Sequence, residues 1–366
     1  MMMNIGKNIL RSSLFALCIA LFFFVGCEKK FDFSTLPPDE NISVNDTSYI
    51  ELTPPFTGFT HISSVIVGGD QLMYVADKGA SKIIQMNIAG AKLGDVTILH
   101  PTSVAQDSRL DLLVCGEMVV GNDTIGAIFR IHLAKVSLRL SQITASHIDT
   151  VWKERSSPAR RFVSLIVVSE NQYIAARLGP NNSSPIDPDS RLLWFKKTDT
   201  LITPISDLQT GVGSAITFLN KPTGLVSFPN RKDFIVTQTS EGVSYGAIWM
   251  SYQNTSDFTG WIPKFDPTIP TQRVDFISPN QFIQANGVTI DANREDVFIF
   301  NAFADSNGYA IKKFDRKGKF KPESIHPRDV SPTLREPVCG AFSDKILYVA
   351  TPSRIFRFKL STDFNR

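Results

Sequence analysis

The sequence contains few of the residues from which metal and redox sites are built. It has four cysteines and five histidines in 366 residues. No Cys-x-x-Cys pair occurs, and no cysteine or histidine stands at a zinc-ligand spacing from another. The sequence therefore gives no sign of a zinc centre.

An excess of charge of one sign is also nearly absent. The chain has 38 Lys and Arg against 35 Asp and Glu, a net charge of +3. Without Lys7 and Arg11, which belong to the N-terminal segment described next, the balance is 36 to 35, or +1. Proteins that bind nucleic acid through its phosphates present a basic surface. The composition thus gives no electrostatic case for a nucleic-acid partner.

Long apolar runs are confined to the beginning of the chain. Lys7 and Arg11 precede an apolar stretch of 13 residues, 14–26, and the chain turns polar from Glu28 onward. A membrane-spanning helix needs about 20 apolar residues. The order of basic, apolar and polar zones predicts a cleaved secretory signal over residues 1–26.

The end of this signal is more specific. Phe24-Val25-Gly26-Cys27 resembles the lipobox of bacterial lipoproteins. The resemblance implies cleavage before Cys27, lipid on Cys27 and attachment to a membrane, which several acyl chains make stable. Glu28 differs from the aspartate that retains some lipoproteins at the inner membrane, so an outer-membrane lipoprotein is favoured, on either its periplasmic or its surface side. The alternative is an ordinary signal peptide that contains a cysteine by chance.

Residues 27–47 are polar, contain Pro37-Pro38 and show little apolar periodicity. They predict a flexible tether that reaches on the order of 25 Å. The folded domain is expected over residues 48–366.

That domain is dominated by an internal repeat. Each copy contains apolar, alternating segments bounded by Gly, Asn or Pro, which is the pattern of β-strands. Runs such as 146–152 and 273–277 can supply a fourth strand to a copy. No segment after the signal predicts a long amphipathic helix. Three clear copies cover 62–90, 287–318 and 340–360, and three weaker ones cover 102–133, 162–197 and 224–252.

Six four-stranded units predict an all-β chain folded as a six-bladed β-propeller, with five or seven blades left open. The last copy ends after its third strand, so residues 48–52 are expected to supply the fourth and close the ring. The three clear copies resemble NHL-type repeats and TolB-like six-bladed propellers. This resemblance implies a fold without implying an activity.

Two cysteines remain in the predicted domain. Cys115 and Cys339 both lie in apolar, strand-like runs. They are predicted to be buried free thiols, although an oxidising envelope would also permit a disulfide between them.

A binding face is predicted where the loops are long. In a propeller blade, the loop between the second and third strands lies on the same face as the start of the first strand. These loops are lengthened at 116–125, 178–190, 239–246 and 302–308. Loops on a rigid scaffold are where function concentrates.

Six residues are expected to ring the channel mouth on that face, where each first strand begins, and to contact a polar ligand. Only one of them is acidic, which does not make a calcium cage. They are His61, Thr102, Arg161, Thr223, Asn286 and Glu336.

An enzymatic alternative rests on one of these residues. Asn286-Gly287 is similar to the Asn-Gly segment of gluconolactonase-like propellers, where the resemblance implies that Asn286 is a calcium ligand. Residues 59–61 and 222–224 lack the acid or amide expected at two other ligand positions. The alternative is therefore a calcium-dependent lactonase or esterase-like hydrolase with one matching ligand.

The sequence favours a lipid-anchored binding or scaffolding module of a bacterial cell envelope. Its expected partners are the membrane, through lipid on Cys27, and an envelope protein or glycan. No catalytic residue is assigned, and no cofactor is expected except calcium under the alternative.

Overall fold

The computed structural model describes residues 47–155, 157–184, 187–205, 219, 221–239, 246–264, 276–277, 281–282, 284–301, 310–325, 334 and 336–364. The predicted signal, Cys27 and nearly all of the tether lie outside this set, as do residues 240–245 and 302–308 of two predicted long loops. Among the described residues no helix is long and apolar enough to cross a membrane.

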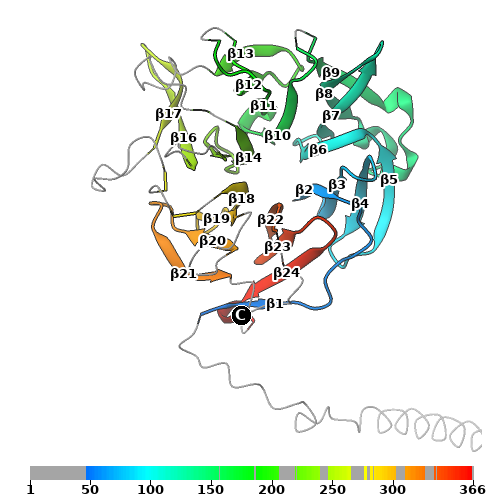
Figure 1. The fold of residues 1–366 in the computed structure, drawn as a ribbon. Helices are drawn as coiled ribbons and strands as arrows, with labels where there is room; N and C mark the ends of the chain where they lie inside the picture. The colour runs from blue at the N-terminus through cyan, green and yellow to red at the C-terminus, as the bar shows by residue number, and fades with distance from the viewer. Residues whose placement is uncertain are drawn as a thin grey trace, which may run out of the picture. The chain divides into compact units, whose positions relative to one another are not determined.

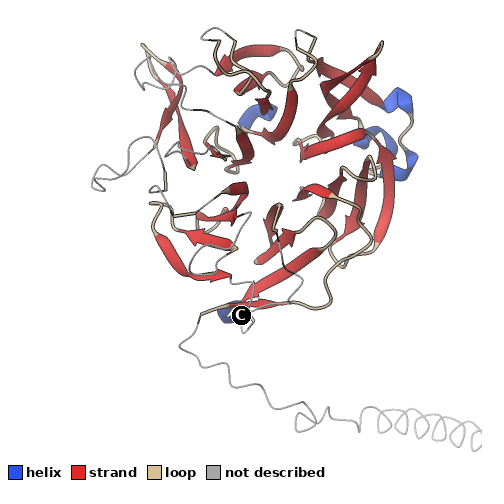
Figure 2. Ribbon diagram, in the orientation of Figure 1, coloured by secondary structure: helices blue, strands red, loops and turns tan. Residues whose placement is uncertain are grey.

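Six antiparallel sheets of four strands each form a ring, which confirms the predicted six-bladed β-propeller (Figure 1). Figure 2 shows that strands make up nearly all of the regular structure, with only short helical turns between them. In blade order the strands are β2 (Ile62–Val67), β3 (Leu72–Asp77), β4 (Lys82–Asn87) and β5 (Lys92–Thr97); β6 (Leu99–Gln106), β7 (Leu112–Val120), β8 (Asp123–Ile131) and β9 (Ile148–Lys153); β10 (Arg161–Val167), β11 (Tyr173–Leu178), β12 (Arg191–Phe195) and β13 (Leu201–Ile205); β14 (Pro222–Ser227), β15 (Phe234–Gln238), β16 (Ala247–Asn254) and β17 (Thr259–Pro263); β18 (Ala285–Asp291), β19 (Asp296–Asn301), β20 (Ile311–Phe314) and β21 (Phe320–Ile325); and β22 (Cys339–Ser343), β23 (Ile346–Ala350), β24 (Ile355–Leu360) and β1 (Tyr49–Glu51).

The N-terminal strand closes the ring as predicted. β1 pairs antiparallel with β24 and is thereby the fourth strand of blade 6. One strand expectation was wrong: the fourth strand of blade 4 is β17, which pairs with β16, and not residues 273–277. Phe276 and Ile277 are instead buried core residues, which explains their apolar pattern.

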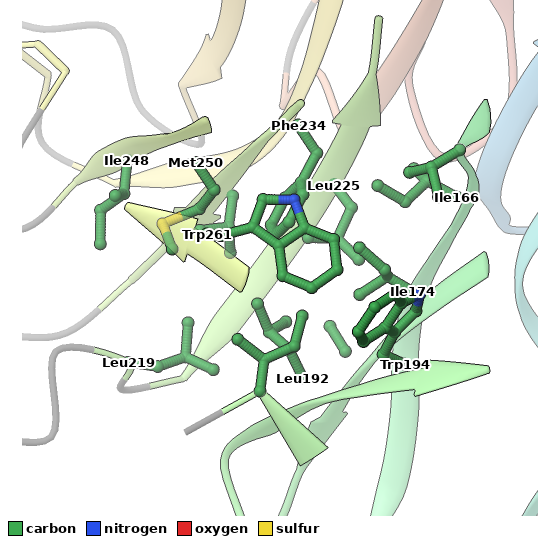
Figure 3. Packing of buried hydrophobic residues seen from close by; sticks show 14 residues of the cluster. Ile166, Ile174, Leu192, Trp194, Leu219, Leu225, Phe234, Ile248, Met250 and Trp261 are labelled. Carbon is green, nitrogen blue, oxygen red and sulfur yellow. The ribbon is translucent and has the colours of Figure 1, made fainter. Parts of the chain in front are cut away.

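The core is divided among the interfaces between blades. Six clusters of buried apolar side chains occupy the six interfaces, one between each blade and the next. Figure 3 shows the cluster between blades 3 and 4, where Trp261 packs edge-on against Trp194 with 4.7 Å between ring centroids. Trp261 also donates its Nε1–H to the Lys232 carbonyl at 2.8 Å. Trp194 donates its own Nε1–H to Gln172 Oε1 at 3.0 Å, so both indole nitrogens of this apolar cluster are satisfied.

Strand alternation explains why both faces of a blade are apolar. Successive side chains of a strand point to opposite faces of its sheet. On β11, Tyr173 and Ala175 pack toward blade 2, whereas Ile174 and Ala176 pack toward blade 4. Such a strand has to be apolar at every position, so it reads as a continuous hydrophobic run.

We expect ring closure to depend on the Tyr49 ring. That ring stands edge-on to Phe298 of blade 5 at 5.8 Å, and the Lys313 ammonium lies 5.4 Å from its centroid. Loss of this packing in Tyr49→Ala is expected to lower the free energy of unfolding by about 3 kcal/mol, measured by urea denaturation.

Tyr49→Phe is the matched control. The buried Tyr49 hydroxyl has no hydrogen-bond partner among the described residues, so its removal is expected to be neutral or stabilising. A Tyr49→Phe protein as unstable as Tyr49→Ala would contradict this account of closure.

Candidate functional site

The first strands of the six blades surround a central channel. β2, β6, β10, β14, β18 and β22 supply its walls, and the cavity has a volume of about 340 Å³. The described residues that line it include no Asp, Glu, His, Lys or Arg. The channel is thus a neutral cavity of hydroxyl and amide groups, backbone and aliphatic side chains.

One of the two predicted thiols lies in this wall. Cys339 lines the channel, whereas Cys115 is fully buried between blades 2 and 3. The two are not paired. Burial raises the pKa of the Cys339 thiol to about 12, although a hydrogen bond from the Val65 backbone acts in the opposite direction. The thiol is therefore protonated at neutral pH and adds no charge to the channel.

The channel mouth is ringed by one residue from each blade. In four blades this residue stands at a single-residue bulge in the pairing of the first and second strands, and in blade 2 it ends a longer irregularity. The six residues are Ser63, Thr102, Val163, Thr223, Asn286 and Val338.

The polar members of this ring connect neighbouring blades. Each donates a hydrogen bond to the carbonyl that precedes the equivalent residue of the next blade, so four of the six interfaces are bridged at the mouth. The bonds run from Ser63 Oγ to Pro101 O (2.7 Å), from Thr102 Oγ1 to Phe162 O (2.6 Å), from Thr223 Oγ1 to Ala285 O (2.6 Å) and from Asn286 Nδ2 to Pro337 O (3.2 Å).

The next position along each strand is always small. It is serine in blades 1 to 3, glycine in blades 4 and 5 and cysteine in blade 6. Ser103 Oγ accepts the Leu165 amide at 3.0 Å, so serine here joins adjacent blades. A Cβ atom on Gly287 would lie only 2.9 Å from the Val338 carbonyl oxygen, which leaves no room for a side chain. The six residues are Ser64, Ser103, Ser164, Gly224, Gly287 and Cys339.

Three of the six predicted mouth residues line the channel. Thr102, Thr223 and Asn286 do so, and the structure brings them together at its mouth. His61, Arg161 and Glu336 are not among the lining residues. In those blades the residue that lines the channel stands two positions later in the chain than the predicted one. The positions that sequence reasoning missed are Ser63, Val163 and Val338.

The Asn286-Gly287 pair has a structural explanation in this ring. Asn286 bridges to the next blade, and Gly287 permits the close backbone approach. Calcium binds several oxygen ligands, carboxylates among them. The described lining residues offer no carboxylate to accompany Asn286. This donor set does not fit a calcium ion.

Charged side chains lie away from the axis, above blades 2 and 3. Arg161 donates from Nε to Glu117 Oε1 at 2.7 Å and from Nη2 to the Thr124 carbonyl at 3.0 Å. Glu117 is on β7 and Thr124 is on β8, so one guanidinium holds both strands of this hairpin. Burial alone would raise the pKa of Glu117, but hydrogen bonds from His100 and Arg161 outweigh it and lower the pKa.

A second ionic network fixes the predicted long loop of blade 3. Arg160 and Arg177 are both buried. Arg160 Nε donates to Asp189 at 2.6 Å, and each arginine donates to one oxygen of Asp187, at 2.7 Å and 2.6 Å. Glu154 accepts from Arg177 Nη1 at 3.1 Å. Burial opposes ionisation of Asp187, but the two arginines lower its pKa to about 2. The described part of the loop is therefore anchored by groups that stay charged at neutral pH.

The β7–β8 hairpin extends beyond its neighbours as a finger, residues 118–125. Its residues pair with one another, while β6 and β9 pair only with residues nearer its base. Val119 and Val120 at its tip are 62% and 46% exposed. Because consecutive strand residues face opposite ways, both sides of the tip are apolar.

No family model matches the chain, and no curated protein matches its sequence. The fold is similar to that of several solved structures. Regucalcin from Agrobacterium tumefaciens, described as a calcium-binding protein, is 10% identical with a TM-score of 0.57 over 83% of this chain and 91% of that chain. The PQQ-bound aldose sugar dehydrogenase from Streptomyces coelicolor is 11% identical with a TM-score of 0.57 over 86% and 99%. A luciferin-regenerating enzyme is 12% identical with a TM-score of 0.56 over 86% and 95%. At these identities the likeness shows the fold alone.

Calcium is expected to leave the stability of this protein unchanged. The measurement is the melting temperature of wild type and Asn286→Ala with and without millimolar Ca²⁺. The variant should melt lower under both conditions, because loss of the bond to Pro337 costs about 1 kcal/mol. A calcium-dependent stabilisation of wild type that Asn286→Ala abolishes would contradict the prediction and support the hydrolase.

Proposed function

We propose that this propeller is a binding module of the bacterial envelope that docks a protein partner on the face above blades 2 and 3. The observation that carries the proposal is the finger, which presents Val119 and Val120 to solvent. A two-stranded ribbon is marginally stable alone in water, and this one is secured only at its base. Apolar groups exposed on such a projection are suited to burial in a partner.

The face is preorganised for binding. Arg161 holds the base of the finger, and Arg160 and Arg177 hold the neighbouring loop of blade 3. Gly126 at the base allows the two blades to approach, since a Cβ there would lie 2.8 Å from the Arg160 carbonyl oxygen. Elements that are already ordered lose less conformational entropy when they bind.

The exposed side chains favour a protein over a glycan. Aromatic rings commonly stack against sugars, and the described part of this face exposes valines rather than large aromatics. The exposed phenylalanines among the described residues are Phe320 and Phe364, which lie in blade 5 and at the C-terminus. Buried aliphatic contacts are typical of the cores of protein interfaces.

The proposal includes attachment to the membrane through lipid on Cys27. The support is the sequence alone: a short apolar run, a small residue before Cys27 and a polar tether. The tether leads into β1, so a lipid anchor would connect to the propeller at the closing strand of blade 6.

The finger is tested by capture from cross-linked, gently solubilised membranes, with mass spectrometry of the recovered proteins. Wild type is expected to recover one stoichiometric envelope protein. Val119→Ser/Val120→Ser is expected to reduce its recovery at least tenfold, because loss of buried anchors costs about 1–3 kcal/mol.

Ile88→Ser is the matched control. Ile88 is 46% exposed, as is Val120, but lies at the turn between β4 and β5, on the opposite face. Equal recovery by the finger variant and wild type would overturn the proposed face. If wild type recovers no protein partner but is retained on an envelope polysaccharide, the ligand of this face is a glycan and not a protein.

Cys27→Ser is expected to shift the protein from the membrane fraction to the soluble fraction, because acyl chains supply most of the membrane affinity. Cys18→Ser is the control, since that residue leaves with the signal. A Cys27→Ser protein that stays with the membrane would contradict lipid anchoring.

A further inference from the structure

The chain enters the propeller on the face opposite the finger. In every blade the second and third strands join on the finger face, so the third strand ends on the other side of the disc, called here the entry face. Tyr49, the first residue of β1, lies beside Leu360, the last residue of the third strand of blade 6. The Ser361 amide donates to the Ser48 carbonyl at 2.8 Å. A lipid on Cys27 would therefore be connected to the propeller at the entry face.

Two aromatic rings are exposed on this face, in blades 5 and 6. Phe320 begins β21 and is 38% exposed, and Phe364 follows the short helical turn after β24 and is 45% exposed. No other phenylalanine, tyrosine or tryptophan of the described residues is exposed. The turn before Phe364 is fixed, because buried Asp363 accepts from Arg294 Nη2 at 3.0 Å and 3.2 Å. The ring is thus presented to solvent by an anchored segment.

Cations without acidic partners adjoin Phe320. The turn between β20 and β21 exposes Arg316, Lys317 and Lys319, and none of them forms an ion pair within the described part of the chain. The acid of this turn, Asp315, instead accepts the backbone amides of Lys317 and Lys319 at 2.8 Å and 2.9 Å. Its carboxylate shapes the turn and leaves the three side chains to solvent.

Blade 6 adds one cation to this excess. Lys359 Nζ lies 5.2 Å from the centroid of the Phe364 ring. The turn between β22 and β23 exposes Asp344 and Lys345, whose charges offset each other. The resulting surface, called here the basic-aromatic patch, combines two rings with four cations. It consists of Arg316, Lys317, Lys319, Phe320, Lys359 and Phe364.

The patch lies where the chain from Cys27 arrives. β1 contacts β21 of blade 5 and pairs with β24 of blade 6, and Figure 1 shows these strands together at one side of the ring. Any membrane that held Cys27 would be near this surface, whereas a separate acidic protein would have no reason to bind at the point of chain entry. Position and charge thus favour a lipid surface as the occupant.

We propose that the basic-aromatic patch rests on the anionic headgroups of the membrane that holds the protein. Anionic lipid surfaces attract Lys and Arg, and aromatic rings settle at the level of the headgroups. The contact is weak alone, but a tether gives it a high effective concentration. The inference rests on the lipid anchor of the proposed function and adds an orientation, in which the entry face meets the membrane and the finger points away from it.

Phe320→Trp places a fluorescent probe in the patch. The full-length, lipidated protein is reconstituted on vesicles of equal parts phosphatidylglycerol and phosphatidylcholine with brominated acyl chains, which quench tryptophan on contact. After subtraction of the wild-type emission, the probe is expected to lose about half of its emission, because an interfacial ring reaches the acyl chains. Val120→Trp at the finger tip is the matched control and is expected to keep its emission. An unquenched Phe320→Trp, or equal quenching of both probes, would overturn the proposal.

Lys317→Gln/Lys319→Gln, made in the Phe320→Trp protein, tests the charge. We expect the quenching to be largely lost, because each cation near an anionic surface strengthens binding about fivefold. The matched control is Lys196→Gln/Lys197→Gln, two exposed lysines in the equivalent turn of blade 3, across the ring from blade 6. The control is expected to retain the quenching. Equal loss in both double variants would reflect net charge alone and would also overturn the patch.

Neutral vesicles separate this proposal from the lipid anchor. Flotation of wild type with pure phosphatidylcholine reports the lipid on Cys27, because the patch has no anionic headgroups to bind there. Failure to float with these vesicles would refute the anchor. Quenching of Phe320→Trp on the anionic vesicles decides the patch in either case.

Discussion

The packing of each blade against the next is the interaction on which the rest of this structure depends. A four-stranded sheet with two apolar faces cannot be stable alone in water, and here each face is covered by a neighbouring blade. The six core clusters therefore form one cycle. The cycle is complete only when β1, from the N-terminal end of the domain, completes blade 6 at the C-terminal end.

This cycle imposes a steric condition on the axis. Six first strands converge there, so residues that face neighbouring strands have to be small. Serine satisfies the condition in blades 1 to 3 by accepting a hydrogen bond from the next blade. Glycine satisfies it in blades 4 and 5 by removing the side chain, and blade 6 has the small side chain of Cys339. The same crowding explains why the hydroxyl and amide groups of the mouth hold blades together.

The architecture could be predicted from the sequence because it depends on periodicity. Apolar strands between polar turns recur six times, and the missing fourth strand of the last copy indicated closure by residues 48–52, near the observed β1 (Tyr49–Glu51). The same pattern misplaced the fourth strand of blade 4, because buried Phe276 and Ile277 resemble a strand. Buried apolar residues give a similar sequence pattern whether they lie in a strand or in an irregular segment of the core.

The site was less accessible to such reasoning because it depends on register and on ion pairs. Bulges move a residue onto the channel wall without changing the apolar pattern, so Ser63 was missed and His61 was chosen. Arg161 was expected to contact a ligand, yet its guanidinium is occupied by Glu117 and Thr124, which lie 44 and 37 residues away. Local residue spacing in the sequence does not reveal hydrogen-bonded partners that lie this far apart along the chain.

Function in a symmetric scaffold is expected where the symmetry is broken, because equivalent blades can only repeat one structural role. The most pronounced departures here fall above blades 2 and 3. They include the longest described hairpin and the pair of buried arginines. None of these is required by blade stacking, which the other blades achieve without them. The tip of the finger exposes Val119 and Val120 and pairs with no neighbouring strand, so blade stacking does not explain it and a role outside the fold does.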